Sequence, residues 1–284
     1  MARPTIAIMY DFDKTLCTTD MQEYDFIRNL GMTPTEFWGE CSKLTKKNEM
    51  DKILAYMYVM LKMCKDKNIP LTSEYLNNCG KNVVLYKGVS TWFDRIDEYA
   101  DKIGVNVEHY IISSGITEII EGTSIAKHFK HIYGCKFIYN EFGEAIWPGL
   151  AINFTLKTQY IFRIAKGVLD VRDDDNLNNH QNNKKIPFEN MIYIGDGLTD
   201  VPCMKLLKDK GGRSIALYPS TNQRKQALKL VEDERINYVC VADYRENSTL
   251  EKIVKLMMDN VSTMSELKER EQKQIQAFKK ASEV

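Results

Sequence analysis

The chain has 284 residues, 44% of them apolar, and its 39 basic and 39 acidic side chains leave no formal net charge. This length suffices for one large domain, or for one domain that carries a smaller insert. Nothing in the balanced charge suggests a strongly basic surface for nucleic acids or anionic membranes, so we expect neither partner.

The cysteines and the apolar segments indicate the compartment. Seven cysteines are scattered along the chain without a CxxC pair. An odd, scattered set is typical of free thiols in a reducing compartment rather than of a disulfide framework or a zinc site. No apolar run is long enough for a signal peptide or a membrane span. We therefore expect a cytoplasmic protein.

Five short apolar runs predict buried strands, and helical patterns separate most of them. Alternating strands and helices predict an α/β fold, a doubly wound (Rossmann-like), mainly parallel sheet flanked by helices. Ligands on such sheets bind beyond the carboxyl ends of the strands. The predicted strands are 6–10, 109–112, 191–194, 214–217 and 238–241, and the helical patterns are 90–103, 156–167 and 249–258.

The stretch from 20 to 82 is helical in pattern and contains no convincing strand. Thr33 and Glu36 have the spacing of a capping box, so a helix is expected to begin there. Another helix can begin at Ser73. We predict a core formed by 1–18 and 84–284, interrupted by a small helical lid domain at 19–83.

Two later segments have no predicted function. Residues 171–185 are rich in Asp and Asn. A carboxylate metal site would fit this composition, but a solvated loop fits it better. The tail from Ser262 has the pattern of a charged helix, which more often packs on its own domain than recruits a partner. Its thin apolar stripe consists of Met264, Leu267, Ile275 and Phe278.

Two carboxylates follow the first predicted strand. Asp11 and Asp13 stand two residues apart, directly after 6–10. Beyond a strand end they can converge on one divalent cation. Oxygen ligation by few protein groups suits Mg²⁺, which takes substrate phosphate as a further ligand. An Asx-type turn that closes the strand is the alternative.

A second pair of carboxylates follows the strand at 191–194. Residues 195–200 read Gly-Asp-Gly-Leu-Thr-Asp, which places Asp196 and Asp200 around a tight turn. The glycines permit close approach of the backbone, and both carboxylates can face one crevice. A strand-to-helix turn with an Asp N-cap would explain the same residues.

Two serine hydroxyls and one lysine are the remaining candidate site residues. Ser113 and Ser114 follow the strand at 109–112. Hydroxyls and backbone N–H groups at a helix start can bind an anion, but simple capping of the next helix explains either serine alone better. Lys157 lies near the start of a helical pattern. A lysine there is usually a solvated charge, and it gains interest because the other groups need a cation beside them.

These four elements, in this order, resemble the motifs of the haloacid dehalogenase-like (HAD) hydrolase superfamily. The resemblance covers about 5–16 and 85–220. The sequences at 86–89 and 113–115 are similar to the phosphoserine-phosphatase-like branch, and the helical insert resembles a C1-type cap. The matching elements are residues 11–15, Ser113, Lys157 and residues 195–200.

The resemblance implies a Mg²⁺-dependent phosphatase that forms an aspartyl-phosphate on Asp11. It implies that Asp11, the Asp13 backbone carbonyl and Asp196 hold the metal, while Asp200 binds it directly or orients the other ligands. The Asp13 carboxyl would be the general acid and base, a group that carbon–halogen-cleaving members lack. The phosphate oxygens would be held by Ser113, Ser114 and Lys157.

The resemblance implies a small phosphate monoester as substrate. Asp20 lies where phosphoserine phosphatases carry a substrate-binding Glu. However, residues 31–87 contain no arginine to bind a substrate carboxylate, which argues against phosphoserine. Arg28 could substitute, although an exposed position on a helix is the simpler explanation for it.

Three other functions remain open from the sequence. A phosphomutase or other phosphotransferase could use the same fold. A phosphoryl-accepting signalling domain also places aspartates at strand ends, but it needs neither this length nor a helical insert. A catalytically idle binding protein on the HAD scaffold is the third, and the filled reactive positions argue against it. The sequence predicts no oligomeric state.

Overall fold

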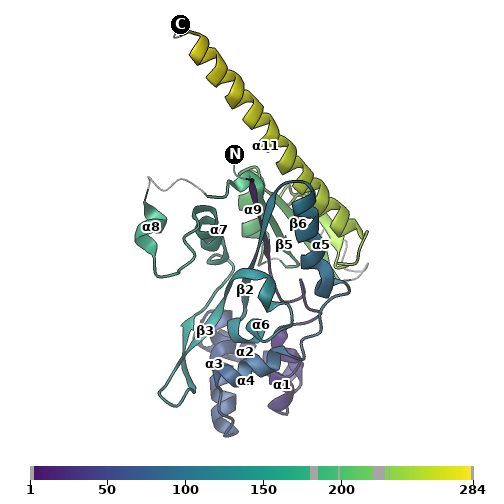
Figure 1. Ribbon diagram of the computed structural model, residues 1–284. Coiled ribbons are helices and arrows are strands. Elements are labelled where there is room, and N and C mark those ends of the chain that lie inside the picture. Colours follow the sequence, from purple (N-terminus) through teal and green to yellow (C-terminus); the bar gives the residue numbers. More distant parts are fainter. Residues whose placement is uncertain (1–2, 180–184, 198, 220–227, 230, 283–284) are drawn as a thin grey trace.

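The computed structural model describes residues 3–179, 185–197, 199–219, 228–229 and 231–282 (Figure 1). In this part of the chain, seven strands form one sheet in the order β4-β3-β2-β1-β5-β6-β7, and only the β3–β4 pair is antiparallel. The predicted mainly parallel α/β fold is confirmed. The strands are β1 Thr5–Tyr10, β2 Asn106–Ile116, β3 Phe129–Tyr139, β4 Ala145–Leu150, β5 Met191–Gly195, β6 Arg213–Tyr218 and β7 Tyr238–Val241.

The five apolar runs form β1, β2, β5, β6 and β7, as predicted. The central strands β1 and β5 are buried almost throughout, because helices cover both faces of the sheet. No apolar run predicts the β3–β4 hairpin. β3 mixes apolar side chains with His131 and Lys136, and Pro148 in β4 argues against a strand. Pro148 is tolerated because β4 forms the edge of the sheet.

A helical segment, α1–α4, is inserted between β1 and α5 and gathers at one end of the sheet (Figure 1). The capping box is confirmed. The Thr33 hydroxyl accepts from the Glu36 N–H (3.3 Å), and the Glu36 carboxylate accepts from the Thr33 N–H (2.8 Å). The helices are α1 Phe26–Asn29, α2 Pro34–Asn48, α3 Lys52–Asp66, α4 Ser73–Gly80, α5 Val89–Lys102, α6 Thr117–Glu121, α7 Lys157–Lys166, α8 Asp174–Asn178, α9 Val201–Asp209 and α11 Thr249–Ser282, with short 3₁₀ turns at Met21–Glu23, Ala126–His128 and Phe188–Asn190.

The prediction of a solvated loop at 171–185 is partly wrong. Helix α8 lies within this segment, and the Asp173 side chain caps its start. Asp174 forms an ion pair with the buried Arg163 of α7, which anchors α8 to the core. Residues 180–184 lie outside the described residues.

The prediction that the tail packs on its own domain is also wrong. Helix α11 is continuous and packs on the sheet layer as far as Val261, but its outer half projects away from the molecule (Figure 1). The Ser262 hydroxyl still donates to the Ile103 carbonyl oxygen (2.9 Å), and beyond that level the body of the protein ends. None of the described helices, α11 included, is long and apolar enough to cross a membrane.

Candidate active site

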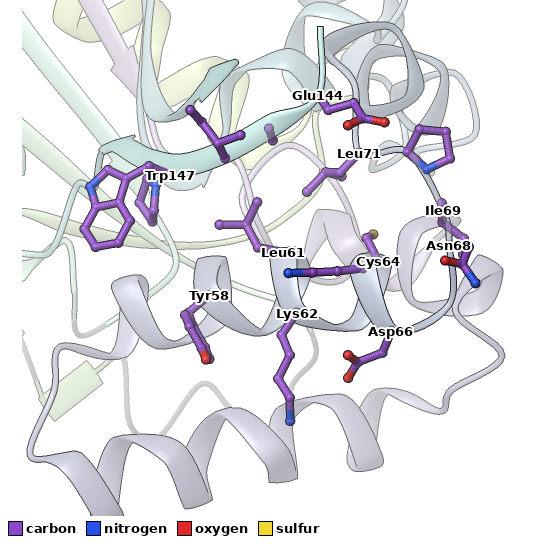
Figure 2. Close-up of a pocket in the computed structure, with 15 residues that line it drawn as sticks. Tyr58, Leu61, Lys62, Cys64, Asp66, Asn68, Ile69, Leu71, Glu144 and Trp147 are labelled. Carbon is purple, nitrogen blue, oxygen red and sulfur yellow. The ribbon is translucent and has the colours of Figure 1, made fainter. Parts of the chain in front are cut away.

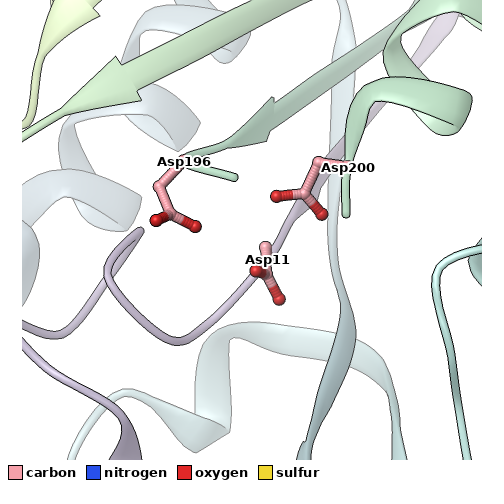
Figure 3. Close-up of side chains that lie close together, drawn as sticks. All are labelled: Asp11, Asp196 and Asp200. Atoms are coloured by element: carbon pink, nitrogen blue, oxygen red, sulfur yellow. The ribbon is translucent and has the colours of Figure 1, made fainter. Parts of the chain in front are cut away.

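Two neighbouring central strands end in acidic residues at the same edge of the sheet. Asp11 directly follows β1, and Asp196 directly follows β5. The Asp11 N–H donates to the Ile194 carbonyl oxygen (2.9 Å), so strand pairing continues up to the site. Oxygens of Asp11, Asp196 and Asp200 lie within 4.8 Å of one another (Figure 3). The structure therefore brings these three predicted residues together.

Asp200 is held in place by buried partners. Although it stands at the N-cap position of α9, its side chain makes no capping hydrogen bond. One of its oxygens accepts from the Tyr193 hydroxyl (2.8 Å), and the other accepts from the Gly197 N–H (3.2 Å). A Cβ at position 195 would lie 2.5 Å from an Asp200 oxygen, so glycine is needed there. The turn is therefore shaped to point Asp200 at Asp11.

Lys157 is a buried cation between two carboxylates. It is the first residue of α7, and its side chain is only 1% exposed. Its Nζ lies 2.7 Å from an Asp200 oxygen and 3.1 Å from an Asp11 oxygen. The interpretation as a solvated surface lysine is therefore wrong. A buried charge of this kind is stable only with such partners.

Burial and mutual repulsion set the protonation of the cluster. Burial, followed by the charge of Asp200, raises the pKa of Asp11 to about 6. Burial and the charge of Asp11 raise the pKa of Asp196 to about 8. Burial lowers the pKa of Lys157, but Asp11 and Asp200 more than offset this and hold it above its ordinary value. Three carboxylates against one ammonium leave an excess of negative charge that a divalent cation would neutralise.

The Asp13 carboxylate is not one of the three in this cluster. Its Oδ1 accepts from the Met21 N–H (2.7 Å), which ties the loop after β1 to the first turn of the insert. Burial, then the charges of Asp20 and Asp11, raises the pKa of Asp13 well above its ordinary value. Asp13 is thus a carboxyl group that holds a proton readily beside Asp11.

The two serines lie within β2 rather than before a helix. Helix α6 begins only at Thr117, so neither serine caps it. The buried Ser113 Oγ accepts from the Gly115 N–H (3.0 Å), which leaves its own proton available. Within the described residues, the Ser114 Oγ is buried without a hydrogen-bond partner. Both hydroxyls can therefore donate to an added anion.

A cavity of about 480 Å³ opens between the insert and the strand ends. Asp13 and Ser114 line it from the core side. Gln22 also lines it, is only 2% exposed, and has a side-chain oxygen with no hydrogen-bond partner among the described residues. The insert side is lined by Asp20, Trp38, Cys41, Ser42, Thr45, Lys46, Lys52, Ile53 and Tyr56.

The two predicted insert residues differ in position. Asp20 lines the cavity, but the ammonium of Lys14 already pairs with it (2.7 Å). Arg28 is exposed on α1 and does not line the cavity.

Gln22 was not predicted, because periodicity marks a buried side chain without showing what it faces. Trp38 and Tyr56 are two of the insert aromatics expected mostly in the lid core, with one or two in the pocket, and both line the cavity. The Tyr56 hydroxyl donates to the Ser114 carbonyl oxygen (2.6 Å) and joins α3 to β2.

A larger groove of about 890 Å³ lies elsewhere, between α3 and β4 (Figure 2). Tyr58 and Leu61 line it on one side and Trp147 on the other. None of its lining residues belongs to the acidic cluster. Its size therefore gives it no part in the chemistry of the strand ends.

Comparison with known proteins identifies the family of the chain. A model of the family "haloacid dehalogenase-like hydrolase" matches residues 8–205. An uncharacterised protein of Borreliella burgdorferi is 28% identical over 271 residues, which cover 86% of this chain and 93% of that protein.

Two solved structures share the fold. A HAD family hydrolase from Salmonella enterica serovar Typhi aligns with a TM-score of 0.59 and 17% identity over 91% of this chain and 72% of that one. A phosphoserine phosphatase solved as a phospho-aspartyl intermediate analogue aligns with a TM-score of 0.53 and 15% identity over 89% of this chain and 99% of that one. The family match covers both strand ends that carry the aspartates and most of the chain, so this protein belongs to the haloacid dehalogenase-like hydrolase family.

Proposed function

We propose that the protein is a Mg²⁺-dependent phosphatase that hydrolyses a small phosphate monoester through an aspartyl-phosphate on Asp11. The observation that carries this proposal is the buried Asp11 carboxylate, 3.1 Å from the Lys157 ammonium and beside Asp196 and Asp200. A nucleophilic carboxylate and a fixed cation at one strand end are what in-line attack on a phosphoryl group requires.

The acidic cluster has the donor set for Mg²⁺. Carboxylate oxygens with excess negative charge suit this hard cation. Asp11, Asp196 and the Asp13 backbone carbonyl would hold it. Asp200, already fixed by Lys157 and by a tyrosine hydroxyl, would bind or orient it. When bound, the ion screens the repulsion between Asp11 and an incoming phosphate dianion.

The proposed reaction has two steps. An Asp11 oxygen forms a bond to phosphorus as the bond from phosphorus to the ester oxygen breaks, and the leaving alkoxide takes the proton from Asp13. Asp13 then takes a proton from water, and the water oxygen attacks phosphorus. This step releases inorganic phosphate and restores Asp11. The raised pKa of Asp13 supports its role as proton donor at neutral pH.

The phosphate oxygens need donors that are already in place. Lys157 supplies a fixed positive charge beside Asp11. Ser113 and Ser114 supply hydroxyl protons, and the buried Ser114 Oγ has no other partner in the described chain. Donors fixed before reaction stabilise charge that develops in the transition state.

We further propose that the insert at 19–83 is a cap and that the 480 Å³ cavity receives the leaving group. Lys46 and Lys52 line it without an ion-pair partner among the described residues, whereas Asp20 is neutralised by Lys14. This balance favours a leaving group with its own anionic or polar substituent over one with an ammonium group. The open side-chain oxygen of Gln22 would accept a hydrogen bond from it.

The test is hydrolysis of p-nitrophenyl phosphate with and without Mg²⁺. The wild-type protein should hydrolyse it only with Mg²⁺, and Asp11→Asn should reduce kcat by about 10⁴-fold or more. Thr18→Val, in the same loop but outside the cluster, is the matched control and should retain activity. Equal rates for wild type and Asp11→Asn would refute the nucleophile, and no activity on a broad panel of phosphate esters would refute the phosphatase.

A further inference from the structure

An exposed apolar stripe runs along α11, and most of it lies on the projecting half. Leu256, Met264, Leu267, Ile275 and Phe278 are exposed by 67%, 46%, 54%, 48% and 77%. They account for every exposed large hydrophobic residue of α11 within the described chain. Isolated helical ends of this length are marginal in water without tertiary packing, so this half of the helix needs a covering partner.

The stripe repeats every 11 residues. Ile253 and Leu256 recur as Met264 and Leu267, and again as Ile275 and Phe278. Eleven residues advance about 1,100° around an α-helix, within about 20° of three full turns, so all six side chains share one face. A polar residue follows four positions after Leu256 and again four positions after Leu267. These residues are Asn260 and Glu271.

The projecting half of α11 also carries charged side chains that are exposed to solvent. Two ion pairs, Glu266–Arg270 and Glu269–Lys273, stand at (i, i+4) spacing. At about 100° per residue, Glu269–Lys273 lies roughly opposite the stripe and Glu266–Arg270 about 110° from it. The residues that hold α11 on its own domain, among them Val254 and Val261, lie about 110° from the stripe. Apart from Ile253, which packs partly against the core, the stripe is therefore separate from the body contact.

We propose that this stripe pairs with the same stripe of a second copy of the chain, with the two helices antiparallel. A two-fold axis between residues 265 and 266 places each apolar side chain of the stripe opposite another apolar side chain of the second copy. Asn260 then meets Glu271, whose carboxylate can accept from the amide, whereas a parallel, in-register pair would oppose Glu271 to Glu271. The remaining pairs are Ile253 with Phe278, Leu256 with Ile275, and Met264 with Leu267.

The area of the stripe is adequate for a stable dimer. With roughly 200 Å² for each large apolar side chain, the exposed fractions correspond to about 600 Å² per copy. A pair would thus cover on the order of 1,200 Å², the lower end of specific protein interfaces. An exposed apolar patch of about 600 Å² is at the upper limit for monomeric proteins.

The experiment is sedimentation velocity of the full-length protein. At about 100 µM the wild-type protein should sediment as a dimer with twice the 32.9 kDa mass of the chain. Leu267→Glu places two charges close to the axis and should raise the dimer dissociation constant at least about tenfold. Gln276→Glu adds the same side chain to the solvated face and should leave the dimer intact.

A charge pair tests the direction of pairing. Met264→Lys alone should dissociate the dimer, as Leu267→Glu does. The double variant Met264→Lys/Leu267→Glu should restore it, because antiparallel pairing sets each lysine against a glutamate of the other copy. Equal thermal unfolding midpoints at low concentration would show that the variants fold. A monomeric wild type, or a dissociated double variant, would overturn the proposal.

Discussion

The two sides of the 480 Å³ cavity are built in different ways. On the core side, Asp13 and Ser114 lie in the loop after β1 and at the end of β2, beside the buried cluster of Asp11 and Lys157. On the insert side, Lys46 and Lys52 extend from helices with exposed side chains and no ion-pair partner in the described chain. Asp13 and the Asp11–Lys157 pair are thus held by hydrogen bonds and charge, whereas the two lysines of the insert side are not. We infer that the core sets the reaction and the insert sets the substrate.

The largest effect is expected when the buried ammonium of Lys157 is removed. Lys157→Met leaves Asp11 and Asp200 buried without it, so we expect a loss of about 3–5 kcal/mol in the free energy of unfolding. Activity should fall by about 10²–10³-fold in protein that remains folded. Urea unfolding and steady-state kinetics measure the two effects. Lys52→Met, on the insert side, is the control, and an equal loss of stability there would contradict the comparison.

Replacing the proposed general acid should act most strongly on the chemical step. Asp13→Asn should lower kcat by about 10²–10⁴-fold on an alkyl phosphate, because an alkoxide needs a proton to leave. The loss should be smaller on p-nitrophenyl phosphate, whose leaving group departs as a stable anion. Parallel kinetics on both substrates measure the difference. Equal losses on the two would rule out proton donation by Asp13.

The raised carboxyl pKa values predict how stability and metal binding depend on pH. The native protein holds the protons of Asp196 (pKa about 8) and Asp11 (about 6) more tightly than the unfolded chain, where the ordinary value is 3.8. The metal-free protein should therefore lose stability as pH rises from about 4 to about 8, and the loss is absent below about 4. Mg²⁺ competes with these protons, so it should stabilise more at high pH.

Thermal unfolding with and without Mg²⁺ at about pH 5.5 and about pH 8.5 measures this effect. The increase in Tm caused by Mg²⁺ should be larger at the higher pH. Asp196→Asn should raise the Tm of the metal-free protein at high pH and remove most of the response to Mg²⁺. A Mg²⁺ response that shrinks as pH rises would contradict the assignment of the cluster.

The smallest effects should come from the insert side. Lys46→Gln and Lys52→Gln should each raise KM about 3–10-fold for a phosphate ester whose leaving group carries a carboxylate. Both variants should hydrolyse p-nitrophenyl phosphate at the wild-type kcat. Lys62→Gln, in the groove between α3 and β4, is the matched control. Unchanged KM values in all three variants would show that the lysines do not face the substrate.

Sequence patterns predicted the strands of the core well, because each strand and the residue that follows it are adjacent in the sequence. Each buried parallel strand is one apolar run, and the residue after it must lie at the carboxyl edge of the sheet. That Asp11 and Asp196 share one site was implied by the family resemblance, and the structure shows that β1 and β5 are neighbours. The burial of Lys157 was not visible locally, because the surrounding helix has the pattern of a half-exposed one.

The remaining features depend on contacts between distant segments. Gln22 and Tyr56 reach the cavity only because the insert folds back over β2. β4 escaped prediction because an edge strand tolerates Pro148, which an inner strand would not. For α11, the apolar stripe was visible but its partner was not, since periodicity identifies a face to be covered and not the surface that covers it.

The central claim is that Asp11 becomes phosphorylated during turnover. The direct measurement is acid quenching of the enzyme with Mg²⁺ and a phosphate ester, followed by peptide mass analysis. We predict a phosphoryl group on Asp11, in the peptide that contains the junction of β1 and the following loop, and its absence in Asp11→Asn. A phosphoryl group on another residue, or turnover by an enzyme that never carries one, would contradict the account.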